Sequence, residues 1–368
     1  MEQQERQQYR GDPSLQRPPS TGFVCRESSR RRDDEGQPMV VFSCTLPPNH
    51  TTTTTTTNTT TTTVTQTLSF DCKEPSCGVL SEQEAQQAAD EADDVDEDEV
   101  AMDPFFFEQG YTLAGKTGWQ VWPGSRIVVD GLLWPQPATD SSRLQYWQQR
   151  LLLCDDENDD SSSTTTRILE LGAGVGVVGS CLAAAAGAQV LETDLSILVE
   201  NSVRPNLQRN SDNLRSDGAD NGPRSTSSPP PDWLSSSGPM PMGRGWVGTA
   251  ALDWTKPLHT QLSEDQCQVD IVIASDCVWL MSMLDGVLST VQGIFETSKR
   301  PSPTLLLSFQ RRDPKDSDSS LMFTSVDRIL QEIQEKRHWK VDCLGWSPVK
   351  YEDQEEVQEV FLFEVTPS

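Results

Sequence analysis

The stretch Arg167-Ile-Leu-Glu-Leu-Gly-Ala-Gly-Val-Gly-Val-Val-Gly179 decides the fold of this chain. Its first five residues are mostly apolar and follow a polar Ser/Thr run, which predicts a short buried strand. Gly172, Gly174 and Gly176 come next, at every second position. Glycine there permits positive φ and lets a ligand approach the main chain without a Cβ in the way. The apolar, alanine-rich residues that follow predict a helix that begins at this turn.

A second strand, Gln189–Asp194, ends in an acid at the spacing of about 20 residues that is typical of nucleotide-type sites. A carboxylate in that place accepts hydrogen bonds from ribose hydroxyls. Two cofactors fit the turn. The glycines of Gly174-x-Gly-x-x-Gly179 match the dinucleotide fingerprint. Glu170, two residues before the first glycine, favours S-adenosylmethionine, because an acid there lies beside the amino-acid end of the ligand and meets no pyrophosphate.

The composition narrows the class of protein. The chain has 368 residues, of which only 35% are hydrophobic, so we expect part of it to be unfolded. Its net charge of −27 disfavours nucleic-acid and membrane partners and suits a basic protein. Nine cysteines without a Cys-x-x-Cys pair predict free thiols, and three histidines make a metal site unexpected. No apolar run approaches the ~20 residues of a membrane span. We expect a cytoplasmic monomer, with the nucleus as the alternative location.

Two regions are predicted by composition. Residues 1–103 are low-complexity and acidic, and we expect them to be largely disordered, because a threonine tract and an acidic run cannot bury enough apolar area. Within them, residues 40–44 and 67–70 are each predicted to add an edge strand. Residues 104–368 form the folded domain, with a disordered insertion over residues 211–245, which are rich in Ser, Pro, Gly and Asp.

The remaining chain alternates strand and helix. Strands are predicted at 248–254, 270–276 and 304–309, and two more at 339–346 and 359–365 close the chain as an antiparallel hairpin. The fold class is therefore α/β, with a Rossmann-like, mostly parallel sheet of seven strands and a C-terminal hairpin. Ligands of such sheets bind at the carboxyl ends of strands, where the strand order reverses. Several candidate residues lie at such ends and predict one cleft: the glycine turn, Asp194, Asp253-Trp254 and Ser275-Asp276.

A tryptophan before the glycine strand is a further candidate. Pro123 suits the first turn of a helix, and Trp122 comes directly before it. Periodicity alone favours a core position for Trp122, with a ligand cleft as the alternative.

Together these residues resemble the seven-β-strand methyltransferases, and more narrowly methyltransferase family 16, the lysine methyltransferases of the methyltransferase-like 21 type. The resemblance runs from about residue 117 to residue 363. It rests on five motifs in order: Thr117-Gly118 with Val121-Trp-Pro123, Leu169-Glu-Leu-Gly-Ala-Gly-Val-Gly176, Glu192-Thr-Asp194, Leu252-Asp-Trp254 and Ala274-Ser-Asp-Cys-Val-Trp279.

The resemblance implies a site for S-adenosylmethionine. Trp122 would line the cleft, and Gly172, Ala173 and Gly174 would cradle the methionine part, with Glu170 beside it. Asp194 would bind the ribose hydroxyls. Two later residues complete the implied cofactor site, with Trp254 at the adenine and Ser275 beside the sulfonium.

The resemblance also implies the catalytic residues. Asp276 would begin the family's Asp-x-x-Tyr motif and orient the incoming nucleophile, and a helix cap is the alternative role for its carboxylate. Trp279 replaces the tyrosine in this chain. An indole only donates a hydrogen bond, but its π face can hold a methylammonium group.

The predicted function is transfer of a methyl group to a protein, at a lysine side-chain amine. The neutral amine displaces the sulfonium methyl in line, and positioning supplies most of the acceleration. A small-molecule N-methyltransferase and a non-catalytic cofactor-binding module are alternatives. A nicotinamide-dependent oxidoreductase is a further one, and it rests only on the dinucleotide spacing of the glycines.

Overall fold

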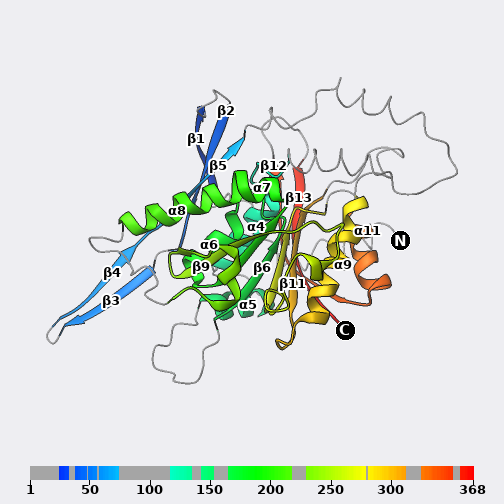
Figure 1. The fold of residues 1–368 in the computed structure, drawn as a ribbon. Coiled ribbons are helices and arrows are strands. Elements are labelled where there is room, and N and C mark those ends of the chain that lie inside the picture. Colours follow the sequence, from blue (N-terminus) through cyan, green and yellow to red (C-terminus); the bar gives the residue numbers. More distant parts are fainter. Residues whose placement is uncertain are drawn as a thin grey trace.

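The computed structural model describes residues 25–32, 38–47, 49–55, 58–73, 117–134, 142–152, 165–217, 229–278, 281–311, 325–350 and 357–368. Its centre is an eight-stranded sheet in the order β12-β13-β11-β10-β6-β7-β9-β8 (Figure 1). Five of these strands run parallel: β6 (Arg167–Leu171), β7 (Gln189–Asp194), β9 (Gly245–Ala251), β10 (Ile271–Ser275) and β11 (Thr304–Gln310). The other three pair antiparallel: β8 (Met240–Met242), β12 (Lys340–Lys350) and β13 (Val357–Thr366).

Helices cover both faces of the sheet, and successive strand residues point to opposite faces. Ile168 and Val190 belong to one core, and their neighbours Leu169 and Leu191 belong to the other. The first core holds α4 (Pro123–Leu133), α5 (Ser142–Leu152), α6 (Val177–Ala186) and α8 (Arg204–Asp217). The second holds α9 (Met281–Thr297), α11 (Val326–Gln331) and the helical turns η4 (Asp232–Ser237) and η6 (Glu332–Lys336) (Figure 1). A short turn, η5 (Leu258–Thr260), follows β9.

The strand order reverses between β6 and β10. From β6 the chain builds outward through β7 and β9, and then returns to place β10 and β11 on the other side. The carboxyl ends of β6 and β10 therefore meet at the point where open α/β sheets bind ligands. The predicted α/β fold, mostly parallel and closed by a hairpin, is confirmed. An eighth strand, β8, was not expected.

The disordered insertion expected over residues 211–245 is wrong at both ends. Residues 211–217 complete α8, and residues 232–242 form η4 and β8. Residues 232–242 are ordered because the stretch, although mostly polar, contains Trp233 and Leu234, whose side chains are buried. The Trp233 indole also donates a hydrogen bond to Gln189 Oε1 at 2.7 Å.

The helical segment after β7 continues through Pro205. A continuous helical segment runs through α7 (Ser196–Leu198), the π-helical η3 (Val199–Val203) and α8. Pro205 has no N–H to donate to the turn before it, and the chain is in a wider π-helical register just there. The proline therefore sits in the first turn of α8 rather than at a helix end.

The N-terminal region is more structured than expected. β1 (Cys25–Arg32), β2 (Pro38–Thr45) and β5 (Thr67–Lys73) form a separate antiparallel sheet in the order β1-β2-β5, so the two predicted edge strands pair with each other. The threonine tract forms a second hairpin from β3 (Asn49–Thr55) and β4 (Asn58–Val64). Threonine is β-branched and suits a strand even where apolar area is scarce.

Some expectations fall outside the described residues. They include the acidic run over 81–103 and the candidate Trp279. In the part of the chain that the structure describes, no helix is both long and apolar enough to cross a bilayer.

Candidate functional site

The glycine turn between β6 and α6 has the backbone that the sequence predicted. Gly172, Gly174 and Gly176 have φ of 67°, 60° and 82°, a region that disfavours any residue with a Cβ. Two main-chain hydrogen bonds hold the turn. Ala173 N donates to Thr193 O at 3.0 Å, and Gly176 N donates to Ala173 O at 2.9 Å.

Neighbouring groups approach the turn closely. A Cβ on Gly172 would lie 3.3 Å from the Trp254 ring, and a Cβ on Gly174 would lie 3.0 Å from Gly118 O. The bare backbone of Gly172 and Gly174 forms a cradle, with the Trp254 ring against the first glycine and Gly118 O against the second.

Asp194 ends β7 next to this turn. Its Oδ2 accepts from Gly174 N at 2.8 Å, and its Oδ1 accepts from Leu195 N at 2.7 Å. Burial raises the pKa of Asp194 to about 6, and these two backbone hydrogen bonds oppose the rise. Each carboxylate oxygen has a second lone pair, so Asp194 can still accept hydrogen bonds from a ligand.

Glu170 lies beneath the turn. Its Oε2 accepts from Gly179 N at 2.8 Å, which ties β6 to the first turn of α6. It stands in register with Glu192 on β7, and both side chains are buried. Glu192 Oε1 accepts from Ser180 Oγ at 3.3 Å, while its Oε2 has no hydrogen-bond partner among the described residues.

Burial is the largest influence on the pKa values of Glu170 and Glu192. Burial raises the pKa of Glu170 to about 8. Burial also holds the pKa of Glu192 well above its usual range, and the neighbouring Glu170 raises it further. Two buried carboxylates on neighbouring strands cannot both ionise cheaply, because each negative charge opposes the other. Glu170 is therefore mainly neutral near pH 7, and both side chains act as hydrogen-bonding supports of the turn.

The two tryptophan candidates lie on either side of the turn. Trp254 is partly buried, and its indole nitrogen has no hydrogen-bond partner among the described residues. Trp122 precedes α4, and its indole N–H donates to Thr117 O at 3.0 Å, which closes the segment that faces Gly174. Ser275 Oγ lies 3.1 Å from Ser125 Oγ on α4, so the first turn of α4 stands against the end of β10.

Asp276 makes the strongest link to α4. Its φ is 52°, and its carboxylate accepts from Gly124 N at 2.5 Å and from Gln310 N at 2.7 Å. Its own N–H donates to Ser308 O at 2.8 Å. Asp276 therefore caps a helix, as the alternative role allowed. The helix is α4, from about 150 residues earlier, and not the one that follows.

The structure thus gathers the predicted residues around one end of the sheet. Those present are Trp122, Glu170, Gly172, Ala173, Gly174, Asp194, Trp254, Ser275 and Asp276. The groups that hold Asp276 were not predicted, namely Gly124 N, Ser308 O and Gln310 N. Asn206, whose Nδ2 donates to Val175 O within the turn at 3.0 Å, was not predicted either. Asn206 and Asn210 are four residues apart and share one face of α8. A predicted helix that included both residues would have placed them side by side.

Comparison with known proteins points to one family. The family model described as "Lysine methyltransferase" matches residues 114–219 and 242–327. No curated relative matches the chain in sequence.

Solved methyltransferase structures are similar at low sequence identity. P. horikoshii TYW2 in complex with MeSAdo is 9% identical over 60% of this chain and 63% of its own length, with a TM-score of 0.32. A SAM-dependent methyltransferase from Methanosarcina mazei is 13% identical over 55% of this chain and 92% of its own, with a TM-score of 0.34. The glycopeptide N-methyltransferase MtfA is 13% identical over 56% and 91%, with a TM-score of 0.33.

Proposed function

The chain belongs to the lysine methyltransferase family, whose model matches more than half of its residues, and from this premise we propose that it methylates lysine side chains of a protein. S-adenosylmethionine is the methyl donor. The observation that carries the proposal is the glycine turn, with three positive φ angles beside the Asp194 carboxylate at the point where the strand order reverses.

The residues of the site fit S-adenosylmethionine. The cradle at Gly172 and Gly174 is one that a single Cβ would fill, and the Trp254 ring that lies against it has a buried indole N–H without a hydrogen-bond partner among the described residues. Asp194 keeps lone pairs for ribose hydroxyls. No pyrophosphate is needed to account for any of these groups.

When bound, S-adenosylmethionine supplies an electrophilic sulfonium methyl group that a neutral amine displaces in line. The chain's own residues bind and orient. Asp194 anchors the ribose end, the glycine turn presents its backbone, and the Trp254 ring lies along the cradle. Positioning of this kind supplies most of the acceleration in such a transfer.

Asp276 acts as a positioning residue. Both of its carboxylate oxygens accept from backbone N–H groups of two different elements, so the side chain fixes α4 against β10 and β11. This brings Ser125 and Trp122 to the cleft. The lysine loses its proton to solvent in this account, and the Asp276 carboxylate acts through the two elements that it joins.

The acidic character of the chain favours a basic protein segment as substrate. A net charge of −27 attracts lysine-rich sequences and repels nucleic acid. Attraction of this kind raises association rates and falls with added salt.

The test is transfer of a labelled methyl group to proteins from cells that lack this protein. The account predicts label that survives protein precipitation and appears as methyl-lysine after hydrolysis, and no label with Asp194→Ala. Label in the small-molecule fraction would identify a small-molecule N-methyltransferase. Retained binding of S-adenosylhomocysteine without any transfer, from any extract, would identify a non-catalytic module.

A further inference from the structure

The N-terminal strands pack into the methyltransferase domain, although they precede the family match, which begins at residue 114. Cys44 Sγ on β2 lies 3.4 Å from Cys181 Sγ on α6, and the Arg126 guanidinium of α4 stacks over the Phe42 ring. The side chains that β2, β5 and the residue after β2 bury belong to the same core as α4 and α6: Val40, Phe42, Cys44, Leu46, Leu68, Phe70 and Cys72.

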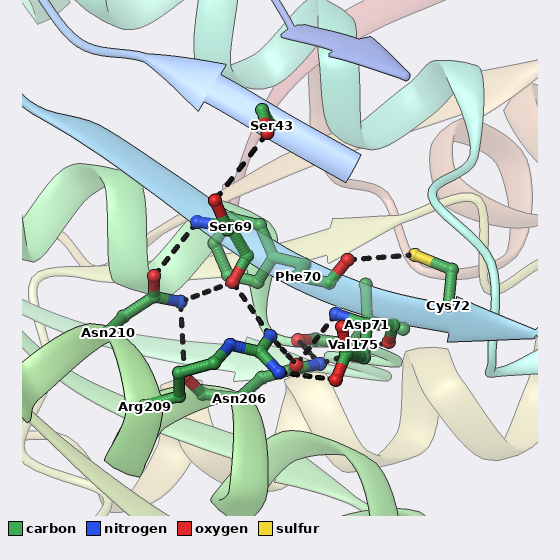
Figure 2. Close-up of polar contacts among 9 residues, drawn as sticks. All are labelled: Ser43, Ser69, Phe70, Asp71, Cys72, Val175, Asn206, Arg209 and Asn210. Carbon is green, nitrogen blue, oxygen red and sulfur yellow. Dashed lines mark hydrogen bonds and ion pairs between the residues drawn. The ribbon is translucent and has the colours of Figure 1, made fainter. Parts of the chain in front are cut away.

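Helix α8 holds β5 through its main chain (Figure 2). Asn210 pairs with both main-chain groups of Ser69, accepting from its N at 2.8 Å and donating to its O at 2.9 Å. Arg209 forms an ion pair with Asp71 and donates to Ser69 O at 2.9 Å. β5 is thereby fixed along the helix mainly through its backbone, and the Asp71 carboxylate adds one side-chain contact.

Asn206 extends this contact to the glycine turn (Figure 2). Its Oδ1 accepts from Asp71 N at 2.8 Å and from Arg209 at 2.6 Å. Its Nδ2 donates to Val175 O at 3.0 Å and to Asp71 O at 3.3 Å. The side chain is buried, with 2% of its surface exposed, so each of these partners matters.

Val175 lies between the second and third glycines of the turn. The peptide unit that joins it to Gly176 is held at both ends, because Asn206 binds its carbonyl and Ala173 O accepts from its N–H. Glycines on either side offer little resistance to rotation of this peptide. The hydrogen bond from Asn206 therefore limits the conformations of the turn.

We propose that Asn206 is a positioning residue for the glycine turn, and that β5 completes the methyl-donor site by holding the Asn206 amide in place. The inference rests on the proposed function for its ligand, but its structural part concerns the turn alone. It assigns a role to a segment that the family match does not include.

Two matched substitutions test the proposal. Asn206→Asp keeps an acceptor for Asp71 N and for Arg209 but loses the donor to Val175 O. Asn210→Asp makes the same change one turn along, where the lost donors serve Ser69 O and Asn206 O and none serves the glycine turn. Each variant loses a hydrogen bond to a β5 carbonyl. Asn210→Asp leaves the two Asp71 main-chain groups that hold the Asn206 amide, so only Asn206→Asp releases the turn.

The measurements are the dissociation constant of S-adenosylhomocysteine, urea denaturation, and hydrogen exchange of the amides of residues 172–179 in the protein without ligand. We expect Asn206→Asp to raise the dissociation constant roughly tenfold and to speed exchange in the turn. We expect both variants to lower the free energy of unfolding by similar amounts. We expect Asn210→Asp to leave the dissociation constant and the exchange in the turn unchanged.

Equal changes in both variants, or unchanged exchange in Asn206→Asp, would overturn the proposal. Failure of the wild-type protein to bind S-adenosylhomocysteine would instead count against the proposed function. The exchange data would still decide the role of Asn206 in that case.

Discussion

Two buried glutamates lie under the glycine turn, and their burial makes the stability of the fold depend on pH. In the folded chain the pKa of Glu170 is raised to about 8 and that of Glu192 is also raised, while an unfolded glutamate titrates near about 4.3. The folded state therefore binds more protons than the unfolded state across this interval. Stability is highest below pH 4.3 as far as this pair is concerned, and it is lost as the pH rises toward 8.

Replacement of Glu192 with glutamine should reduce this loss. The variant removes one titrating group and leaves Glu170 beside a neutral neighbour. We expect Glu192→Gln to lose less stability than the wild type between pH 5.5 and pH 8, by at least about 1 kcal/mol. Urea denaturation at the two pH values measures it, with the exposed Glu335→Gln as control. Parallel pH profiles for all three proteins would contradict the assignment.

Gly174 provides the sharpest test of the turn at the scale of one residue. Its φ is 60°, and a Cβ would lie 3.0 Å from Gly118 O. We expect Gly174→Ala to destabilise the fold by about 1–2 kcal/mol and to abolish binding of S-adenosylhomocysteine. Gly345→Ala is the matched control, because a Cβ there meets nothing within 4 Å. Calorimetry measures binding and thermal melts measure stability for both variants. Wild-type affinity in Gly174→Ala would rule out ligand contact at this turn.

At the scale of elements, Asp276 joins three of them. Its carboxylate binds backbone N–H groups at the start of α4 and at the end of β11, and its own backbone extends β10. Asparagine tolerates its φ of 52° but offers only one acceptor atom. One of the two N–H groups then loses its partner.

We therefore expect Asp276→Asn to lower stability by about 1–3 kcal/mol, as well as to slow methyl transfer. Urea denaturation of the purified variant measures the first effect, and initial rates of transfer measure the second. Unchanged stability together with lost transfer would show instead that the carboxylate faces the substrate.

The elements that the sequence predicted well are those with an unambiguous pattern. The apolar runs of β6, β10 and β11 and the glycines after β6 each allow one structure, and they placed the glycine turn and Ser275 at strand ends. The strand predicted over 248–254 instead ends at Ala251, three residues before Trp254. Elements held by tertiary contacts were missed. η4 depends on Trp233 and Leu234 within a polar stretch, and α8 extends past Pro205 because Asn206 and Asn210 bind a strand more than a hundred residues earlier.

The residues of the site divide in the same way, into those that a sequence pattern marks and those that only tertiary contacts place. Glycines that need positive φ are visible in a sequence, whereas the partners of Asp276 are backbone groups, which every residue carries. No pattern marks Gly124 N or Gln310 N as donors to Asp276, so the sequence left open whether this carboxylate orients the substrate or caps a helix. The hydrogen bond that Glu170 accepts from Gly179 N likewise involves a backbone group that no pattern marks.

At the scale of the whole molecule, the N-terminal sheet and the methyltransferase fold share one core. We expect them to unfold in a single transition. Phe70→Ala on β5 should lower the stability of the entire chain by about 3–5 kcal/mol, because its ring is fully buried. Urea denaturation followed by both tryptophan fluorescence and circular dichroism measures this, with the exposed Ile197→Ala as control, for which about 0.5 kcal/mol or less is expected. An early, separate transition in Phe70→Ala would show an independent N-terminal unit.

The proposed function depends on binding of S-adenosylmethionine at the glycine turn, and a ligand-induced shift in melting temperature measures this binding. S-adenosylhomocysteine and NAD are compared, each well above a plausible dissociation constant, with wild-type protein and Asp194→Ala. A ligand at 100 times its dissociation constant stabilises the folded state by about 2.7 kcal/mol. We predict a shift with S-adenosylhomocysteine alone that Asp194→Ala abolishes. A shift with NAD alone would contradict the account and favour the dinucleotide reading of the same glycines.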